Sequence, residues 1–175
     1  MILPTDRRVF QNSWVVDDLE KALDHWVRIM GVGPFFVLDH ADDIVDVTYR
    51  GQPAELGMRI ALAQAGPVQI EFVQPLSKGP NCYRDTVKPG TMGFHHVCTW
   101  THDIEADMAY FAKMGCPAAN TGRVRDSIRF AYFDTSPYMQ CMMEVMEYTK
   151  EVDELFKIIA DAGNNWDGKD PIRTF

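Results

Sequence analysis

The chain contains one sequence pattern twice, and this repeat constrains the fold more than any other feature. Residues 11–31 read QNSWVVDDLEKALDHWVRIMG, and residues 96–115 read HVCTWTHDIEADMAYFAKMG. Each copy has a β-like run, an acidic helix cap and an amphipathic helix that ends at glycine. Each is followed by a strand that carries a carboxylate, Glu71 in VQIEFVQP and Glu144 in CMMEVME. The repeat therefore predicts two half-domains of one architecture.

Composition limits the class of protein. The chain has 175 residues, 46% of them hydrophobic, and a net charge of −8, which favours one compact domain over disorder. It has no cluster of basic residues beyond Arg7 and Arg8 and no apolar window of membrane-spanning length, so neither nucleic acid nor a membrane is an expected partner. Its four cysteines form no CxxC pair, and the N-terminus does not resemble a signal peptide, so we expect a cytoplasmic protein.

The organisation follows from the repeat. We expect a first βαβββ module over residues 8–75, a connection over 76–91, a second βαβββ module over 92–148, and a C-terminal helix and tail over 149–175. The helices are predicted over 19–30, 104–114 and 150–162 from their apolar spacing. The first module is longer than the second, and the extra length falls around residues 39–55. We expect this insertion to shape the rim of a pocket.

These motifs resemble a known group of proteins. The helix starts DDLEKALDHW and HDIEADMAYF, the segment GFHHVCTW and the strand VQIEFVQP are similar to the vicinal-oxygen-chelate superfamily, which includes glyoxalase I, methylmalonyl-CoA epimerase, extradiol dioxygenases and bleomycin-resistance proteins. The resemblance covers residues 8–148. It implies an α+β fold in which two βαβββ modules pair into a half-barrel around a metal and a substrate. It also implies a small-molecule substrate and a homodimer.

The resemblance also implies a ligand set for one divalent metal ion, which would be Zn, Ni, Co or Mn. Gln11 and His96 each precede an acidic helix cap by seven residues, so they occupy matching positions on the first strand of each module. Glu71 and Glu144 match on the last strands. The inferred ligands are Gln11, Glu71, His96 and Glu144. His95 points to the opposite face of its strand by alternation.

The resemblance is closest to glyoxalase I, because the family's epimerases typically have Gln at the position of Glu71. It implies a glyoxalase- or epimerase-like lyase or isomerase, which acts through an enediolate on a small carbonyl, thioester or aromatic-derived substrate. Glu144 is the first candidate for the proton-transferring base and Glu71 the second. The candidates for the substrate pocket are Trp100, Arg123, Arg125, Tyr138, Met142 and Met146.

Two other functions remain open. A bleomycin-resistance-type protein would bind a small molecule without catalysis and without a catalytic metal. An extradiol-type dioxygenase would need two histidines and one carboxylate around Fe(II), and Gln11 occupies the place of one of these histidines.

Overall fold

The computed structural model describes residues 8–174. In its first half the elements are β1 (Val9–Val15), α1 (Leu19–His25) with a π-helical continuation over Trp26–Met30, β2 (Phe35–His40), β3 (Ile44–Tyr49), β4 (Gln52–Pro53), β5 (Met58–Ala65) and β6 (Val68–Pro75). In its second half they are α2 (Cys82–Thr86), β7 (Gly93–Thr101), α3 (Ile104–Lys113), β8 (Ala118–Val124), β9 (Arg129–Phe133), α4 (Ser136–Met139), β10 (Met142–Glu147), α5 (Lys150–Asn164) and β11 (Ile172–Thr174). The predicted α+β class is confirmed.

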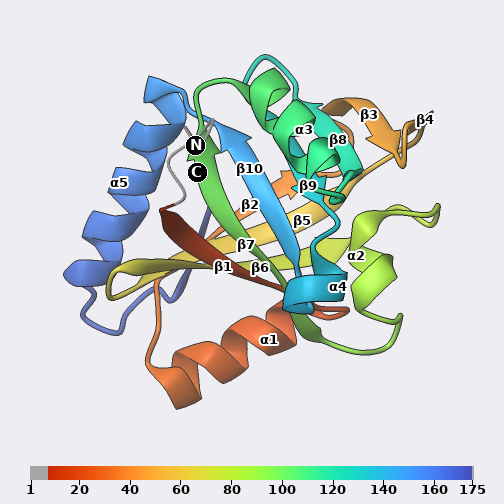
Figure 1. Cartoon of the computed structure of the whole chain (residues 1–175). Coiled ribbons are helices and arrows are strands. Elements are labelled where there is room, and N and C mark those ends of the chain that lie inside the picture. Colours follow the sequence, from red (N-terminus) through yellow and green to blue (C-terminus); the bar gives the residue numbers. More distant parts are fainter. Residues whose placement is uncertain (1–7, 175) are drawn as a thin grey trace.

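One curved sheet holds all these strands, in the order β11-β2-β5-β6-β1-β7-β10-β9-β8-β3-β4 (Figure 1). The first strands of the two repeats, β1 and β7, lie side by side and antiparallel at its centre. The last strand of each repeat flanks its own first strand in parallel, β6 beside β1 and β10 beside β7. The four strands that carry the polar residues of the repeat therefore lie together.

The helices cover both faces of the sheet. The acidic caps act as the sequence predicts: Asp18 accepts a hydrogen bond from Lys21 N, and Asp103 accepts one from Ala106 N. α1 packs its apolar side against the outer face of β5 and β6, and α3 does the same against β9 and β10. α5 packs against the inner face of β2 and β5 through Ile159. It therefore closes one side of the half-barrel.

The insertion of the first module links the two ends of the sheet. β3 leaves β2 after only three residues, 41–43, and pairs antiparallel with β8 of the second module. A link of this length reaches about 14 Å. The edges of the two half-sheets must therefore curl toward each other, and the inner face becomes a nearly closed barrel.

Several elements were not anticipated. β11 extends the β2 edge within the expected tail, α2 lies within the connecting segment, and α4 lies directly before β10, where Pro137 favours the start of a helix. The π-helical turn breaks the helical period of the first repeat, so Met30 is exposed and not part of the apolar face. None of the helices within residues 8–174 has the length and apolar character needed to cross a bilayer.

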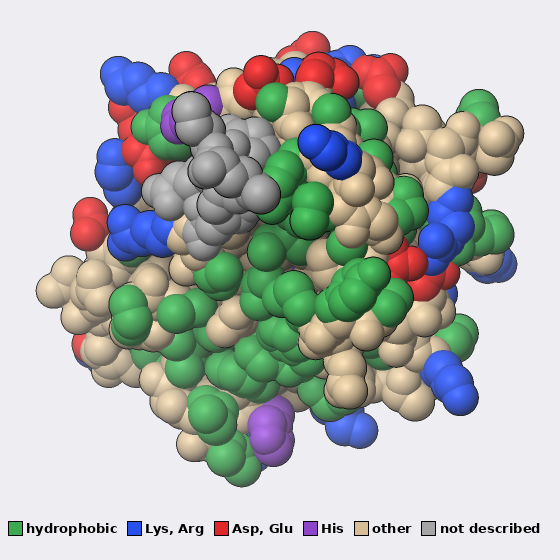
Figure 2. Space-filling model, viewed as in Figure 1, with side chains coloured by type: hydrophobic (Ala, Val, Ile, Leu, Met, Phe, Trp, Pro, Cys, Tyr) green, Lys and Arg blue, Asp and Glu red, His purple; other side chains and the backbone are tan. Residues whose placement is uncertain are grey.

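Hydrophobic side chains gather on the outer surface near α1 (Figure 2). Ile29, Met30, Met92 and Phe94 are exposed. The expected homodimer stays a prediction.

Gly57 tests the link between the half-sheets. A β-carbon at this position would lie 2.6 Å from the backbone oxygen of Ala41, within the link. Gly57→Ala should therefore displace the link and lower the free energy of unfolding by about 1–3 kcal/mol, measured by urea denaturation. Gly79→Ala is the matched control, because no atom lies within 4 Å of its β-carbon, and its effect should stay within about 0.5 kcal/mol. Equal midpoints for the two variants would contradict this close approach.

Candidate metal centre

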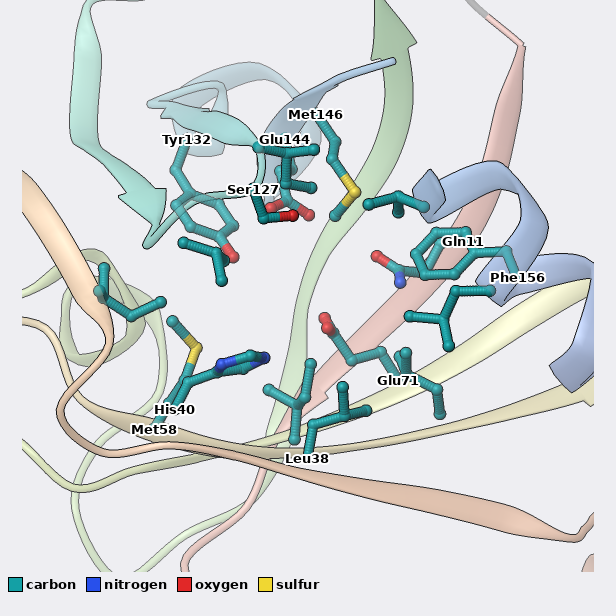
Figure 3. A pocket seen from close by; sticks show the side chains of 17 residues that line it. Gln11, Leu38, His40, Met58, Glu71, Ser127, Tyr132, Glu144, Met146 and Phe156 are labelled. Carbon is teal, nitrogen blue, oxygen red and sulfur yellow. The ribbon is translucent and has the colours of Figure 1, made fainter. Parts of the chain in front are cut away.

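Four polar side chains from the four central strands meet at the seam between the two modules (Figure 3). They are Gln11 on β1, Glu71 on β6, His96 on β7 and Glu144 on β10, and the exposed fraction of each is 5% or less. Figure 3 shows the Gln11, Glu71 and Glu144 side chains directed into one cavity. His96 is fully buried behind the two carboxylates.

Small side chains separate these four residues. In the strand register, Ser13 lies between Glu71 and His96. Cys98 takes the equivalent place between the other two. Ser13 and Cys98 also correspond in the repeat, since each comes two residues after the polar residue of its first strand. The centre of the seam is therefore free of bulky side chains.

The donor atoms converge closely. His96 Nε2 lies 3.0 Å from Glu144 Oε2 and 3.2 Å from Glu71 Oε2. These three residues offer ligand atoms that all lie within 4.8 Å of one another. Gln11 Nε2 donates to Gln69 Oε1 at 2.7 Å, and this hydrogen bond leaves Gln11 Oε1 unused.

The chemistry of this donor set fits a divalent cation. Gln11 Oε1, Glu71 Oε2, His96 Nε2 and Glu144 Oε2 are all buried, and none has a hydrogen-bond partner of good geometry in the described chain. Buried polar atoms are rarely left unpaired, because each costs free energy of desolvation. One imidazole nitrogen and three oxygens form a ligand set that suits several divalent metals.

A hydrogen-bonded pair of histidines fixes the tautomer of His96. His95 Nε2 lies 3.0 Å from the carbonyl oxygen of Cys82, which can only accept, so this nitrogen carries a proton. Burial, together with His96, lowers the pKa of His95 to about 3, so its ring is neutral and its Nδ1 accepts. His96 Nδ1, 2.9 Å away, must then donate. A neutral His96 therefore turns the lone pair of Nε2 toward the two carboxylates.

The carboxylates oppose the effect of burial on His96. Burial favours the neutral imidazole, but Glu144 and Glu71 outweigh it and raise the pKa of His96 to about 9. Without a bound cation, His96 is therefore an imidazolium at neutral pH. A metal ion must displace this proton to bind.

A cavity of about 170 Å³ opens beside this group. Gln11, Glu71 and Glu144 form its polar end, and α5 contributes Val152, Leu155 and Phe156 to its wall (Figure 3). The other lining residues are Leu38, His40, Ile44, Met58, Ile60, Leu62, Val124, Ser127, Ile128, Tyr132 and Met146. Among residues 8–174, the lining includes neither lysine nor arginine.

The structure places one predicted pocket residue, Met146, in this cavity and the others elsewhere. Met142 shares the face of Glu144 but is fully buried in the core beside Tyr83. Trp100 lines a separate hollow, where it stacks on Phe10. Alternation along a strand defines the face of a residue, but not which end of the barrel it reaches.

The remaining candidates lie on the surface. Tyr138 lies on α4, and its exposed fraction is 73%. Arg123 forms an ion pair with Asp46, and Arg125 donates to the backbone oxygen of Asp42. Neither guanidinium belongs to the cavity. The lining from the insertion and α5 had only indirect sequence signals, namely the extra length of the first module and the apolar side of the last helix.

The chain thus has two paired βαβββ modules and, between them, a buried group of two carboxylates and one imidazole that could hold a metal ion. The sequence matches the family model of the Glyoxalase/Bleomycin resistance protein/Dioxygenase superfamily over residues 10–132, and the chain belongs to this superfamily. No curated protein matches the sequence.

Solved structures show the same fold at low identity. A hypothetical protein from Bacillus halodurans is 16% identical, with a TM-score of 0.56 over 82% of this chain and 95% of the other. Methylmalonyl-CoA epimerase from Mycobacterium tuberculosis is 12% identical, with a TM-score of 0.53 over 83% of this chain and 91% of the other. A Streptomyces coelicolor methylmalonyl-CoA epimerase variant in complex with 2-nitronate-propionyl-CoA is 12% identical, with a TM-score of 0.53 over 82% and 95%.

The titration of His96 tests the electrostatics of the group. In metal-free protein, an NMR titration should give His96 a pKa of about 9, and Glu144→Gln should lower it, because the variant removes one of the two carboxylates. Glu147→Gln is the matched control, since Glu147 lies on the same strand but pairs with Arg129. An unchanged His96 titration in Glu144→Gln would contradict the pairing.

Proposed function

We propose that this protein is a metal-dependent lyase or isomerase of the glyoxalase or epimerase type, which acts through an enediolate on a small carbonyl compound with two adjacent oxygens. The observation that carries this proposal is the convergence of four buried donor atoms at the polar end of a largely apolar cavity, where within residues 8–174 only the close approach of His96 to the two carboxylates pairs them. Apolar walls exclude water and strengthen electrostatic interactions at the polar end.

Gln11, Glu71, His96 and Glu144 would hold the ion. When bound, a divalent metal supplies Lewis-acid polarisation of adjacent substrate oxygens, which acidifies the neighbouring C–H bond. The hydrogen bond from His96 Nδ1 to His95 orients the imidazole, and the bond from Gln11 to Gln69 orients the amide oxygen. Both ligands from the first strands are thus held in place by neighbouring side chains.

The charge and size of the cavity favour a neutral, compact substrate. Two carboxylates balance the charge of one divalent cation, and the lining has neither lysine nor arginine to attract an anion. Apolar cavities of about 150 Å³ accept a benzene molecule. A volume of about 170 Å³ therefore suits a single ring or a short branched chain, and a thioester would place only its acyl end inside.

A carboxylate moves the proton. Glu144 and Glu71 both line the cavity, and each has one oxygen, Oε2, close to His96 Nε2. Glu144 is the first candidate for the base and Glu71 the second. The protein's own contribution is to hold this carboxylate dry and beside the C–H bond.

The donor set weighs against the oxygenase alternative. An Fe(II) facial triad needs two imidazoles, whereas the buried group has one, and the His95 ring is engaged with the Cys82 carbonyl. The non-catalytic binding alternative does not account for the convergence of four buried donor atoms.

Metal uptake tests the ligand set. Purified protein should bind about one equivalent of Co²⁺ or Zn²⁺, and His96→Ala and Glu144→Ala should lose it, while Glu147→Ala retains it. Because the metal must displace the His96 proton, apparent affinity should rise about tenfold per pH unit up to pH 9, the pKa of His96, and then level off. Calorimetry in buffers of different ionisation enthalpy measures the released proton. Equal metal uptake by the wild type and His96→Ala would contradict the proposed ligand set.

Proton exchange tests the chemistry. Metal-loaded protein in deuterated water should exchange the C–H hydrogen beside the carbonyl in at least one of a set of neutral α-hydroxyketones (hydroxyacetone, acetoin, α-hydroxyacetophenone), as measured by NMR. Glu144→Gln should slow this exchange by about a hundredfold or more, because it removes the base. Tight metal binding without exchange of any α-hydroxyketone would favour the non-catalytic alternative.

A further inference from the structure

His40 lies in the wall of the cavity that Gln11, Glu71 and Glu144 also line (Figure 3). It is the last residue of β2, directly before the link to β3. The equivalent turn of the second module, between β8 and β9, has no histidine. His40 is therefore a feature of the insertion and not of the repeat.

Asp43 fixes the ring of His40. Nδ1 lies 3.0 Å and 2.9 Å from the two carboxylate oxygens of Asp43, so Nδ1 carries a proton and donates it. In the neutral ring, Nε2 is then an acceptor. Within residues 8–174, no protein group forms a hydrogen bond with Nε2, and Figure 3 shows the ring directed into the cavity.

The link that carries this pair is itself held in place. The backbone oxygen of Asp43 accepts a hydrogen bond of 2.8 Å from Arg125 N, in the second module. Asp39 Oδ1 accepts one of 3.1 Å from Ala41 N. The His40 side chain is only 14% exposed. The acceptor therefore has a defined position relative to the metal centre.

The rest of the wall is largely apolar, and Ser127 and Tyr132 add hydroxyls, of which that of Tyr132 is hydrogen-bonded to Tyr83. Leu38, Met58, Ile60 and Leu62 come from the first module, and Ile128 comes from the second. A ligand that fills the cavity would contact carboxylates at one end, hydrocarbon along its length, and an imidazole acceptor elsewhere. Such an arrangement selects for a second polar group on the ligand.

We propose that His40, oriented by Asp43, is a specificity-determining residue whose Nε2 accepts a hydrogen bond from a ligand hydroxyl other than the two adjacent oxygens. The ligand class is then a compact, neutral, largely apolar compound, polar at two separate points. The orientation of the ligand rests on the proposed function. The hydroxyl preference does not, because it depends only on the cavity and His40.

A pair of matched probes tests this subsite. The probes are α-hydroxyacetophenone and its analogue with a ring hydroxyl in the para position. Isotope-labelled methionine methyl groups report binding by NMR: Met58 and Met146 line the cavity, whereas Met30 and Met114 are exposed. The para-hydroxyl probe should bind about three- to tenfold more tightly to the wild type, which is the usual gain from one added hydrogen bond.

Variants assign the preference to the residue. His40→Leu should bind both probes equally, and Asp43→Asn should retain only part of the preference, because the ring loses its orientation. Asp42→Asn is the matched control, since the Asp42 carboxylate forms no hydrogen bond with His40. Thermal unfolding of each variant separates a loss of folding from a loss of binding. A preference that persists unchanged in His40→Leu, or the absence of shifts at Met58 and Met146 with both probes, would overturn the proposal.

Each titration is repeated after metal removal with a chelator. If the protein takes up no metal but still prefers the para-hydroxyl probe through His40, the result would support this subsite and contradict the proposed metal-dependent function. Normal metal uptake with no role for His40 would do the reverse.

Discussion

The rest of the site depends on two carboxylates buried beside a single imidazole. Glu71 and Glu144 are 5% and 3% exposed, and both approach His96 Nε2. A protonated His96 balances only one of their charges, and a net charge in a low-dielectric interior is costly. A divalent cation beside a neutral His96 would balance both. The metal ion that would polarise a substrate would therefore also neutralise the charge of the two buried carboxylates.

The repeat explains why these groups meet. Antiparallel pairing of β1 with β7 relates the two modules by an approximate two-fold axis at the seam, so equivalent residues lie diagonally across it, with Gln11 opposite Cys98 and Ser13 opposite His96. Gln11 corresponds to His96, Glu71 to Glu144, and the small Ser13 to the small Cys98. One residue per strand, repeated once, is thus enough to build a four-sided site. Each module alone would offer only two of the donors.

The sequence predicted the repeat-derived parts of the structure because their signals are local. Helix caps, alternation and spacing to Asp18 and Asp103 indicated the repeat, and the family resemblance then implied the four residues that the structure brings together. The pairing of β3 with β8 is non-local, and the residue pattern of 44–49 does not indicate which strand pairs with it. For this reason Arg123 was expected in the pocket, whereas its guanidinium pairs with Asp46 of β3. His40 was missed because its role depends on that same pairing.

Symmetry also limits what the repeat can do. A two-fold site treats its two sides alike, whereas an enzyme must hold a substrate in one orientation. Two elements outside the repeat break the symmetry: α5 packs mainly on β2 and β5 of the first module, and the insertion brings His40 to the cavity from that module. The repeat thus supplies the donor residues, and α5 and the insertion determine the orientation in which a substrate would bind. Specificity in this chain should therefore depend on α5 and the 41–43 link more than on the four donors.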